Sequence, residues 1–107
     1  MAVTFNETLS NAVSMAASIN SSAAILDHVN DVCIQCIYTG SPVGSLKAQA
    51  SNNGTDWSDV TGSTVAISGA DNTVYNFANV AYIKLRIVYT RTSGTGSLTV
   101  LCNGKGY

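Results

Sequence analysis

Few residues of this 107-residue chain are of types that carry out chemistry, and they are not grouped in the sequence. The one histidine, His28, stands beside Asp27 in a segment that we interpret as a loop. General acid or base catalysis needs a second reactive group held at a fixed distance. No serine in a nucleophile-elbow context and no phosphate-binding glycine loop accompanies this histidine. We therefore interpret His28 as a surface residue and expect the chain to have no enzyme activity.

The three cysteines cannot form a complete disulfide set within one chain, because their number is odd. Cys33 and Cys36 have a spacing that is also found in metal and redox pairs, but in a strand residues three apart lie on opposite faces. No second pair and no chelating histidine follows them. We therefore interpret Cys33, Cys36 and Cys102 as free thiols that pack as small apolar side chains. Pairing between chains is left open.

Oxygen ligands for calcium are another candidate chemistry. Three aspartates and three asparagines lie in or beside predicted turns: Asp56, Asp59, Asp71, Asn52, Asn53 and Asn72. Their spacing is not that of an EF-hand, and Asp and Asn side chains in turns commonly bond to their own backbone. We favour this turn-forming role, and we expect no bound metal and no cofactor.

Trp57 is the most informative single residue, since it follows the turn signal Asn53-Gly54. An aromatic ring beside a polar turn can stack on a sugar, anchor an interface or plug one end of the fold. The packing role is slightly favoured. Together with Tyr75 and Tyr82, Trp57 forms the predicted set of interface or glycan contacts.

Composition restricts the class of partner. Charged residues make up only 10% of the chain, against roughly 25% in a typical soluble domain, and the formal net charge is −1. Lys84, Arg86 and Arg91 are the nearest approach to a basic patch, and we interpret them as a solvated strand face, which excludes nucleic acid as the expected partner. The opening residues lack the segments of a signal peptide or a membrane span. We expect synthesis in a host cytoplasm, no membrane contact, and a Ser, Thr, Asn and Gly surface that packs against neighbouring proteins.

Strand-like alternation is clearest in residues 81–90. Four residues of this run fall on one face and are predicted to be buried: Ile83, Leu85, Ile87 and Tyr89. Gly94 and Gly96 then permit a tight reversal, after which residues 97–102 return with Leu98, Val100 and Cys102 predicted to be buried. We predict that the two runs pair as a hairpin.

Further strands are predicted at residues 31–39, 45–51, 64–67 and 73–77, with Leu46, Ala48 and Ala50 facing inward. Asn53-Gly54 predicts a turn of type I′. Residues 11–26 contain too many Ser and Asn for a stable helix and are interpreted as one or two short strands with a loop. The chain is thus expected to be one all-β domain, an antiparallel β-sandwich of jelly-roll type with about eight strands. Residues 1–26 form either an N-terminal arm or edge strands.

Two stretches carry a resemblance to known proteins: residues 39–60 (TGSPVGSLKAQASNNGTDWSDV) and residues 82–106 (YIKLRIVYTRTSGTGSLTVLCNGKG). They resemble small β-sandwich virion proteins of tailed phages, including capsid decoration or cement proteins with jelly-roll folds. Ser51, Asn53, Gly54 and Trp57 also look like a turn of discoidin-like and other carbohydrate-binding sandwiches. The chain lacks the end-to-end disulfide of discoidin domains.

The phage resemblance implies structural work at the capsid surface of a virion. It implies protein partners, namely the major capsid protein or other virion proteins, and a homo-oligomer, for which a trimer at a capsid symmetry site is favoured. One alternative is a carbohydrate-binding module of a tail or fibre. A tail or head-completion structural component is the other alternative.

Overall fold

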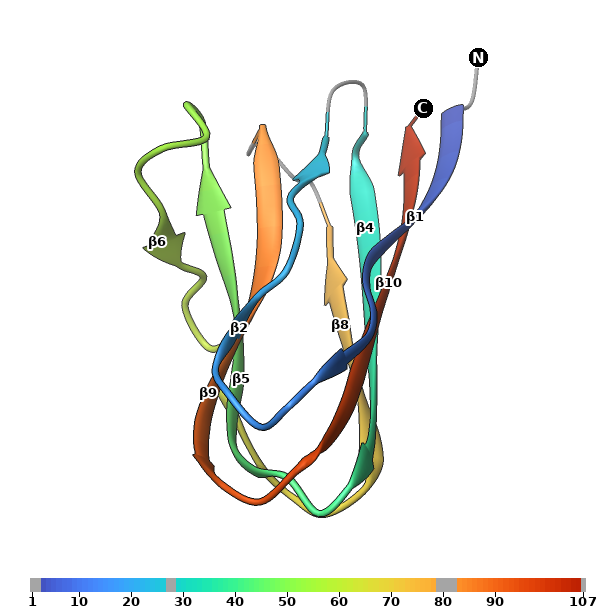
Figure 1. Cartoon of the computed structure of the whole chain (residues 1–107). Helices are drawn as coiled ribbons and strands as arrows, with labels where there is room; N and C mark the ends of the chain where they lie inside the picture. The colour runs from blue at the N-terminus through green and yellow to red at the C-terminus, as the bar shows by residue number, and fades with distance from the viewer. Residues whose placement is uncertain (1–2, 27–28, 79–82, 107) are drawn as a thin grey trace.

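Two antiparallel β-sheets face each other in the computed structural model, which describes residues 3–26, 29–78 and 83–106 (Figure 1). Sheet A contains, in spatial order, β1 (Val3–Ser14), β10 (Gly96–Gly106), β4 (Asp31–Gly40) and β8 (Asp71–Phe77). Sheet B is built on β9 (Lys84–Ser93) and β5 (Val43–Ser51). Beside β9 lie β2 (Ile19–Asn20) and β3 (Ala24–Ile25), and beside β5 lie β6 (Ser58–Asp59) and β7 (Val65–Ser68).

The strand order is that of a jelly roll. The chain passes from β1 in sheet A to β2 and β3 in sheet B, and then through β4, β5, β8, β9 and β10 with a change of sheet at each step apart from the excursion through β6 and β7. Counting β2 with β3 as one interrupted strand, and β6 with β7 as another, reduces the ten strands to eight. The predicted all-β sandwich of jelly-roll type is confirmed. No helix occurs in the described residues, so none of them could form a membrane-spanning helix.

The core forms where the alternating faces of the two sheets meet. In β4 every second residue from Val32 to Tyr38 is buried, and in β10 Leu98, Val100 and Cys102 are buried as predicted. The predicted burial of Leu85, Ile87 and Tyr89 in β9 and of Leu46 and Ala48 in β5 is also confirmed, and Ala50 is partly buried against the core. The predicted burial of Ile83 is wrong, because Ile83 precedes β9 and is 43% exposed.

The predicted hairpin between residues 81–90 and 97–102 is wrong. β9 lies in sheet B and pairs with β5, β2 and β3, whereas β10 lies in sheet A and pairs with β1 and β4. The glycine-containing reversal therefore crosses from one sheet to the other. Gly94 has a φ of +78°, and a Cβ there would lie 1.9 Å from the Ser41 carbonyl oxygen, so the crossing needs glycine for both its conformation and its packing.

The turn at Asn53-Gly54 is not of type I′. Gly54 has a φ of +77°, but Asn53 does not have the positive φ that this turn type also requires. Instead, the Asn53 Oδ1 accepts hydrogen bonds from the backbone N–H groups of Thr55 and Asp56, both at 2.8 Å. The Ser51 Oγ accepts from the N–H groups of Asn53 and Gly54. Side chains thus satisfy the backbone of the loop between β5 and β6, as proposed for the asparagines of the turns.

The N-terminal segment forms an outer strand of sheet A and the short outer strands beside β9 in sheet B. β1 pairs with β10 and shows two register shifts, between Thr8 and Ser10 and between Ser10 and Val13. Residues 11–14 belong to β1, and the next segments form the short strands β2 and β3, in agreement with the strand interpretation of residues 11–26. Leu9 and Met15 are buried in the core. β1 is thus the outer strand of sheet A on this side, and β2 and β3 lie at the edge of sheet B.

Candidate binding surfaces

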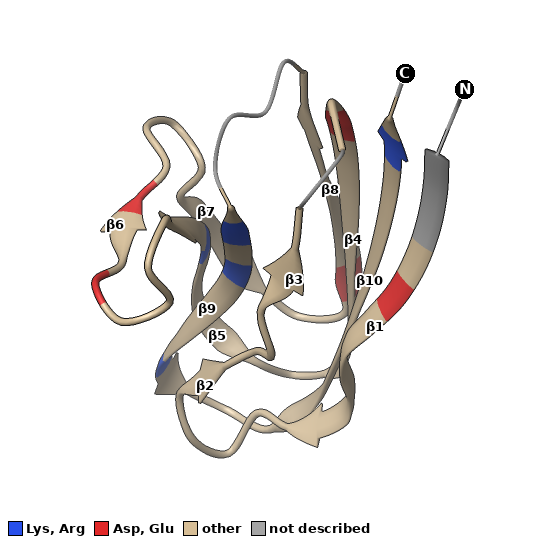
Figure 2. Cartoon of the chain, turned by 90° about the horizontal axis from the view of Figure 1, so that it is seen from above, with Lys and Arg blue, Asp and Glu red and all other residues tan. Residues whose placement is uncertain are grey.

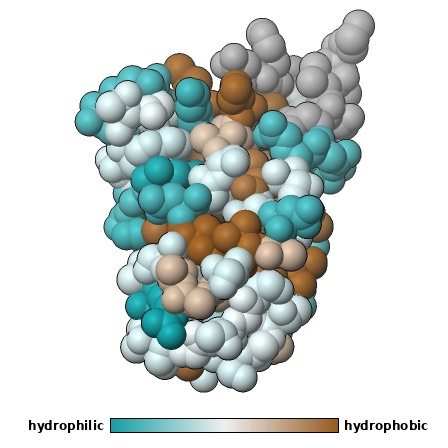
Figure 3. Space-filling model, in the orientation of Figure 1, coloured by the Kyte–Doolittle hydropathy of each residue, from teal (hydrophilic) through white to brown (hydrophobic). Residues whose placement is uncertain are grey.

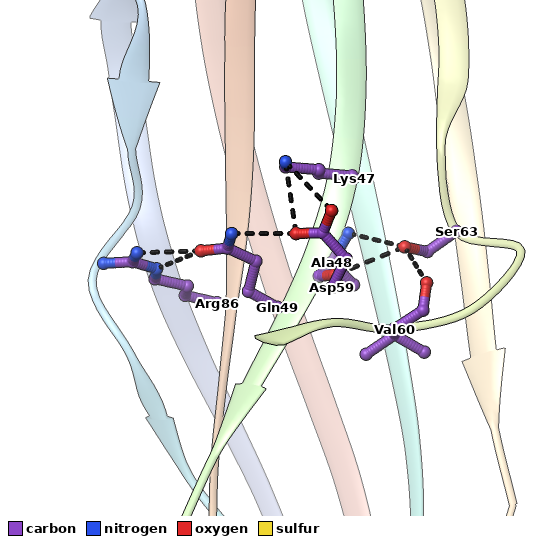
Figure 4. A network of polar contacts seen from close by, with 7 residues as sticks. All are labelled: Lys47, Ala48, Gln49, Asp59, Val60, Ser63 and Arg86. Atoms are coloured by element: carbon purple, nitrogen blue, oxygen red, sulfur yellow. Dashed lines mark hydrogen bonds and ion pairs between the residues drawn. The ribbon is translucent and has the colours of Figure 1, made fainter. Parts of the chain in front are cut away.

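A chain of polar contacts crosses the outer face of sheet B (Figure 4). Gln49 of β5 and Arg86 of β9 are cross-strand partners, and the Arg86 guanidinium donates two hydrogen bonds, of 3.0 and 2.8 Å, to the Gln49 Oε1. The Gln49 Nε2 donates to the Asp59 Oδ1 of β6 at 2.9 Å, and the Lys47 Nζ forms an ion pair with the same carboxylate at 3.1 Å. We call Lys47, Gln49, Asp59 and Arg86 the sheet B network. The Asp59 carboxylate is paired with Lys47, and the Arg86 guanidinium is bound by the neutral Gln49 amide.

Trp57 extends the sheet B network from the neighbouring loop. The guanidinium carbon of Arg86 lies 4.2 Å from the centre of the Trp57 ring, which is the geometry of a cation–π contact. Trp57 is half-buried and does not belong to the core cluster. Its packing partner is thus a strand side chain on the outside of the sandwich, and it does not plug one end of the fold.

Electrostatics in the sheet B network favour the ionised carboxylate. Hydrogen bonds from Gln49 and from Lys47 hold the pKa of the exposed Asp59 below its usual value. Figure 2 places the blue segments of β9 and the red segment of β6 on the same sheet. The side chains of this network can accept hydrogen bonds from a ligand or donate hydrogen bonds to it. Asp59 is a poor general acid, because a carboxyl group with a lowered pKa is ionised at neutral pH.

A polar hollow of about 410 Å³ lies beside the Trp57 loop and is lined by residues that include Asn52, Asp56, Ser58 and Asp59. Its side chains are largely committed within the loop, since the Asp56 Oδ2 accepts from the Asn53 Nδ2 at 2.9 Å. Across the described parts of the chain, no group of three or more His, Cys, Asp or Glu side chains could hold a metal ion. The side chains that line the hollow can form hydrogen bonds with a polar ligand.

The outer face of sheet A is of a different kind. Its side chains alternate with the core residues of β4, β10 and β8, and include the apolar Val74 (52% exposed), Leu101 (38% exposed) and half-buried Ile37. The outward charged residues of β4 and β10 are Asp31 and Lys105 at one end, and Figure 2 shows β10 uncharged apart from this end. We call this surface the sheet A face. It is a broad surface of Thr, Asn, Gln and apolar side chains.

A third apolar area lies where the core reaches the surface between the outer strands. Figure 3 shows a hydrophobic band across the middle of the side on which β1 and β2 lie in Figure 1. The exposed apolar side chains of the N-terminal strands include Val13 of β1 (40% exposed) and Ile25 of β3 (56% exposed). Apolar surface is thus distributed over several sides of the molecule.

The predicted contact residues Trp57 and Tyr75 are not brought together. Trp57 lies on the outside of sheet B, whereas Tyr75 points into the core from β8, is 7% exposed and stacks on Phe77 with ring centres 6.0 Å apart. Tyr82 and His28 lie outside the described residues. The described members of the set thus form no shared aromatic platform.

The three cysteines are free, as predicted. Cys36 and Cys102 are buried, and burial raises the pKa of each thiol to about 12. Cys33 points to the opposite face of β4 and is half-buried. The buried thiols are therefore protonated and unreactive at neutral pH.

Arg86 and Gln49 are surface residues whose role the sequence analysis missed. Arg86 was interpreted as part of a solvated strand face, and Gln49 as an outward polar residue. Their contact depends on the pairing of β9 with β5, which the predicted hairpin of residues 81–90 with 97–102 concealed. The only available signal was that both residues fall on outward positions of alternating strands.

No protein-family model and no curated protein sequence matches this chain. Among solved structures, the SPBc2 prophage-derived protein YomS is similar, with a TM-score of 0.74 and 13% identity over 99% of this chain and 96% of that chain. The PBSX exported protein XepA matches 95% of this chain with 37% of its own length, at a TM-score of 0.58 and 18% identity. The VP2 subviral particle of infectious bursal disease virus matches 99% of this chain with 33% of that chain, at a TM-score of 0.53 and 14% identity. Because the sequence identities are only 13–18%, the similarity to these structures establishes the fold and nothing beyond it.

Proposed function

We propose that this protein is a structural component of a phage virion, a decoration or cement protein that stabilises the shell through protein–protein contacts. The observation that carries the proposal is the sheet A face, a broad outer surface on which the charged residues of β4 and β10 lie at one end. The centres of protein interfaces are depleted in charged residues in the same way. A free soluble protein would more commonly place lysine and glutamate on such a surface.

The solved structures support the same interpretation. The most extensive of the reported matches, over nearly the full length of both chains, is to a prophage-derived protein, and another reported match is to a viral subviral particle. Jelly rolls are frequent in viral shells because the sandwich leaves large side surfaces for contacts with neighbours. The partners proposed are the major capsid protein or other virion proteins, and the protein is proposed to act as a homo-oligomer on the capsid surface.

Deletion of the gene from the phage that encodes it tests the proposal. Wild-type particles and particles without the protein are compared by electron cryomicroscopy and by heating until DNA is released. We expect the deletion to remove density from the outside of the shell, to lower the temperature of DNA release, and to be reversed by added purified protein. Density lost from the tail or neck would instead support a tail or head-completion component. Absence of the protein from wild-type particles would refute a virion role altogether.

A carbohydrate-binding module remains the second candidate, because Trp57 stands beside a hollow lined by hydrogen-bonding side chains. Such a ring could stack on a sugar, but Arg86 already lies over it. A glycan array with the wild-type protein and Trp57→Ala separates the two candidates. A specific glycan signal that Trp57→Ala abolishes, in a protein that remains folded, would favour the module. No glycan signal in the wild type would eliminate it.

A further inference from the structure

The lateral edges of the two sheets differ in how well they are protected from pairing with another chain. An edge strand presents a row of unpaired backbone N–H and C=O groups, and natural proteins protect such edges with short strands, bulges, proline or lysine. Three of the four edges of this sandwich show such protection in the described residues. The fourth, β8, does not.

Sheet B has short, interrupted edges. On one side β2 and β3 contain two residues each, and on the other side β6 contains two and β7 four. In sheet A, β1 is long, but its two register shifts interrupt its pairing, and Ala12 has a φ of +50° within it. None of these edges offers a long, regular strand to a partner.

β8 is a regular seven-residue edge strand, Asp71–Phe77, with the sequence DNTVYNF. It pairs with β4 from Val32 to Tyr38 without a register shift, and no other described strand pairs with it. It contains no proline, glycine or lysine, and its single charge, Asp71, is at its first position. Its central residue, Val74, is 52% exposed. An exposed and regular strand of this kind is suited to β-sheet extension.

We propose that β8 pairs with β8 of a second copy of this chain, antiparallel and about a twofold axis at Val74. In this register Val74 faces Val74 of the second copy, Asn72 faces Asn76, and Asp71 faces Phe77. The strand pairs along its whole length once the Asp71 Oδ1 releases the Asn72 N–H, from which it accepts a hydrogen bond at 2.8 Å, and the two Asp71 carboxylates lie at opposite ends of the contact. A register centred on Thr73 or Tyr75 would leave two residues at one end of each strand unpaired.

The side chains of β8 are compatible with this register on both faces. On the outer face, two valines meet at the axis and are flanked by asparagine pairs, whose amides can donate and accept hydrogen bonds to each other. On the inner face, Thr73 of one copy lies opposite Tyr75 of the other, so no like charges meet. A contact in which the same surface serves both partners is the usual form of a twofold interface.

The pairing would join two copies of sheet A into one continuous eight-stranded sheet, made from twice the four strands of one copy. The sheet A face, with its few charges, would then extend across both chains. The inference rests on the edge geometry and not on the proposed virion role. It predicts a dimer or a multiple of a dimer, in place of the trimer that the phage resemblance favours.

Disulfide trapping tests the register. In a Cys33→Ser background, Val74→Cys places two thiols directly opposite each other, at a Cβ separation of about 4.5–5.5 Å, close to that of a disulfide. We expect Val74→Cys to form a covalent dimer under mild oxidation with copper phenanthroline. The matched control is Leu101→Cys in β10, which is also on the sheet A face but two strands away from β8. This variant should remain monomeric on denaturing gels. Asn72→Cys and Asn76→Cys should cross-link when mixed and not when alone.

Mass measurement by light scattering supplies the second test. The wild type should have twice the 11.1 kDa mass of one chain, or an even multiple of it. Val74→Lys should halve that mass, since two lysines would meet at the axis, while Leu101→Lys should leave it unchanged. A monomeric wild type, a trimer indifferent to Val74→Lys, or equal cross-linking of Leu101→Cys would each overturn the proposal. A monomer that still binds shells would leave the virion role intact, whereas a dimer absent from virions would refute only that role.

Discussion

Three buried tyrosines differ in whether their hydroxyl groups have a hydrogen-bond partner, and this difference predicts opposite effects of the same substitution. The Tyr38 hydroxyl lies 3.0 Å from the Thr73 Oγ1, and the Tyr89 hydroxyl donates to the Val43 carbonyl at 3.2 Å. The Tyr75 hydroxyl is buried and has no partner among the described residues. Burial, followed by the nearby Cys36 and Tyr38, raises the pKa of Tyr75 above its usual value. Changing each tyrosine to phenylalanine removes only the hydroxyl.

The expected sizes follow from the balance between desolvation and hydrogen bonding. An unpaired buried hydroxyl costs about 1–3 kcal/mol, so Tyr75→Phe should raise the free energy of unfolding by about 1–2 kcal/mol. A typical intramolecular hydrogen bond contributes about 1 kcal/mol, so Tyr38→Phe and Tyr89→Phe should each lower it by about that amount. In a domain of this size, 1 kcal/mol corresponds to roughly 4–8 °C in Tm.

Urea unfolding of the four proteins, followed by far-ultraviolet circular dichroism, measures these changes. All samples should be at one low protein concentration, because association would add its own contribution to stability. The expected order of stability is Tyr75→Phe, wild type, and then the two controls. If Tyr75→Phe were destabilised as strongly as Tyr89→Phe, its hydroxyl would have a partner, and the inferred desolvation cost would be refuted.

Three further predictions concern a glycine turn, the accessibility of the thiols and the pH dependence of stability. Gly94→Ala should unfold or strongly destabilise the protein, since the added Cβ would clash with a carbonyl oxygen. The control is Gly69→Ala, where φ is +88° but the space around the Cβ is open. It should lower the free energy of unfolding, measured in urea, by only about 1–2 kcal/mol. In the folded protein, a thiol reagent at pH 8 should modify Cys33 and leave Cys36 and Cys102 unmodified; rapid labelling of all three would contradict their burial. Between pH 9.0, the ordinary thiol pKa, and about pH 12, the unfolded chain releases thiol protons that the folded chain keeps. The free energy of unfolding should therefore fall with rising pH, by about 1.4 kcal/mol per pH unit for each buried thiol. Urea unfolding at a series of pH values measures this change.

Alternation along the sequence predicts which face of a strand is buried, because burial depends only on the side-chain period of two. Leu85, Ile87 and Tyr89 were assigned to the core on this ground, and all are fully buried. Strand partners are not determined by this pattern. The two strands joined through Gly94 present apolar faces that match equally well within one sheet or across the core.

The site was harder to predict than the core, because a surface contact depends on partners from separate strands. Trp57 could be singled out by type and position, but its contact with Arg86 required knowledge that β9 lies beside β5. Tyr75 shows that residue type alone can also suggest a surface role for a side chain that is in fact buried. Its aromatic character suggested a contact residue, yet its position on the inner face of β8 buries it in the core.

The two outer faces of the sandwich differ in whether their polar and apolar side chains already have partners within the chain. On the outer face of sheet B, Lys47 pairs with Asp59, and the Arg86 guanidinium is hydrogen-bonded to Gln49 and lies over Trp57, so these side chains already have partners within the chain. On sheet A, apolar and amide side chains remain open, and the adjoining β8 edge has no strand beside it in the described structure. For both proposed associations, on a shell and between copies, this asymmetry favours sheet A as the contact surface. A charge at Val74 should therefore disturb pairing between copies, and a charge elsewhere on the sheet A face should weaken binding to a shell, while charge substitutions on the outer face of sheet B should do neither.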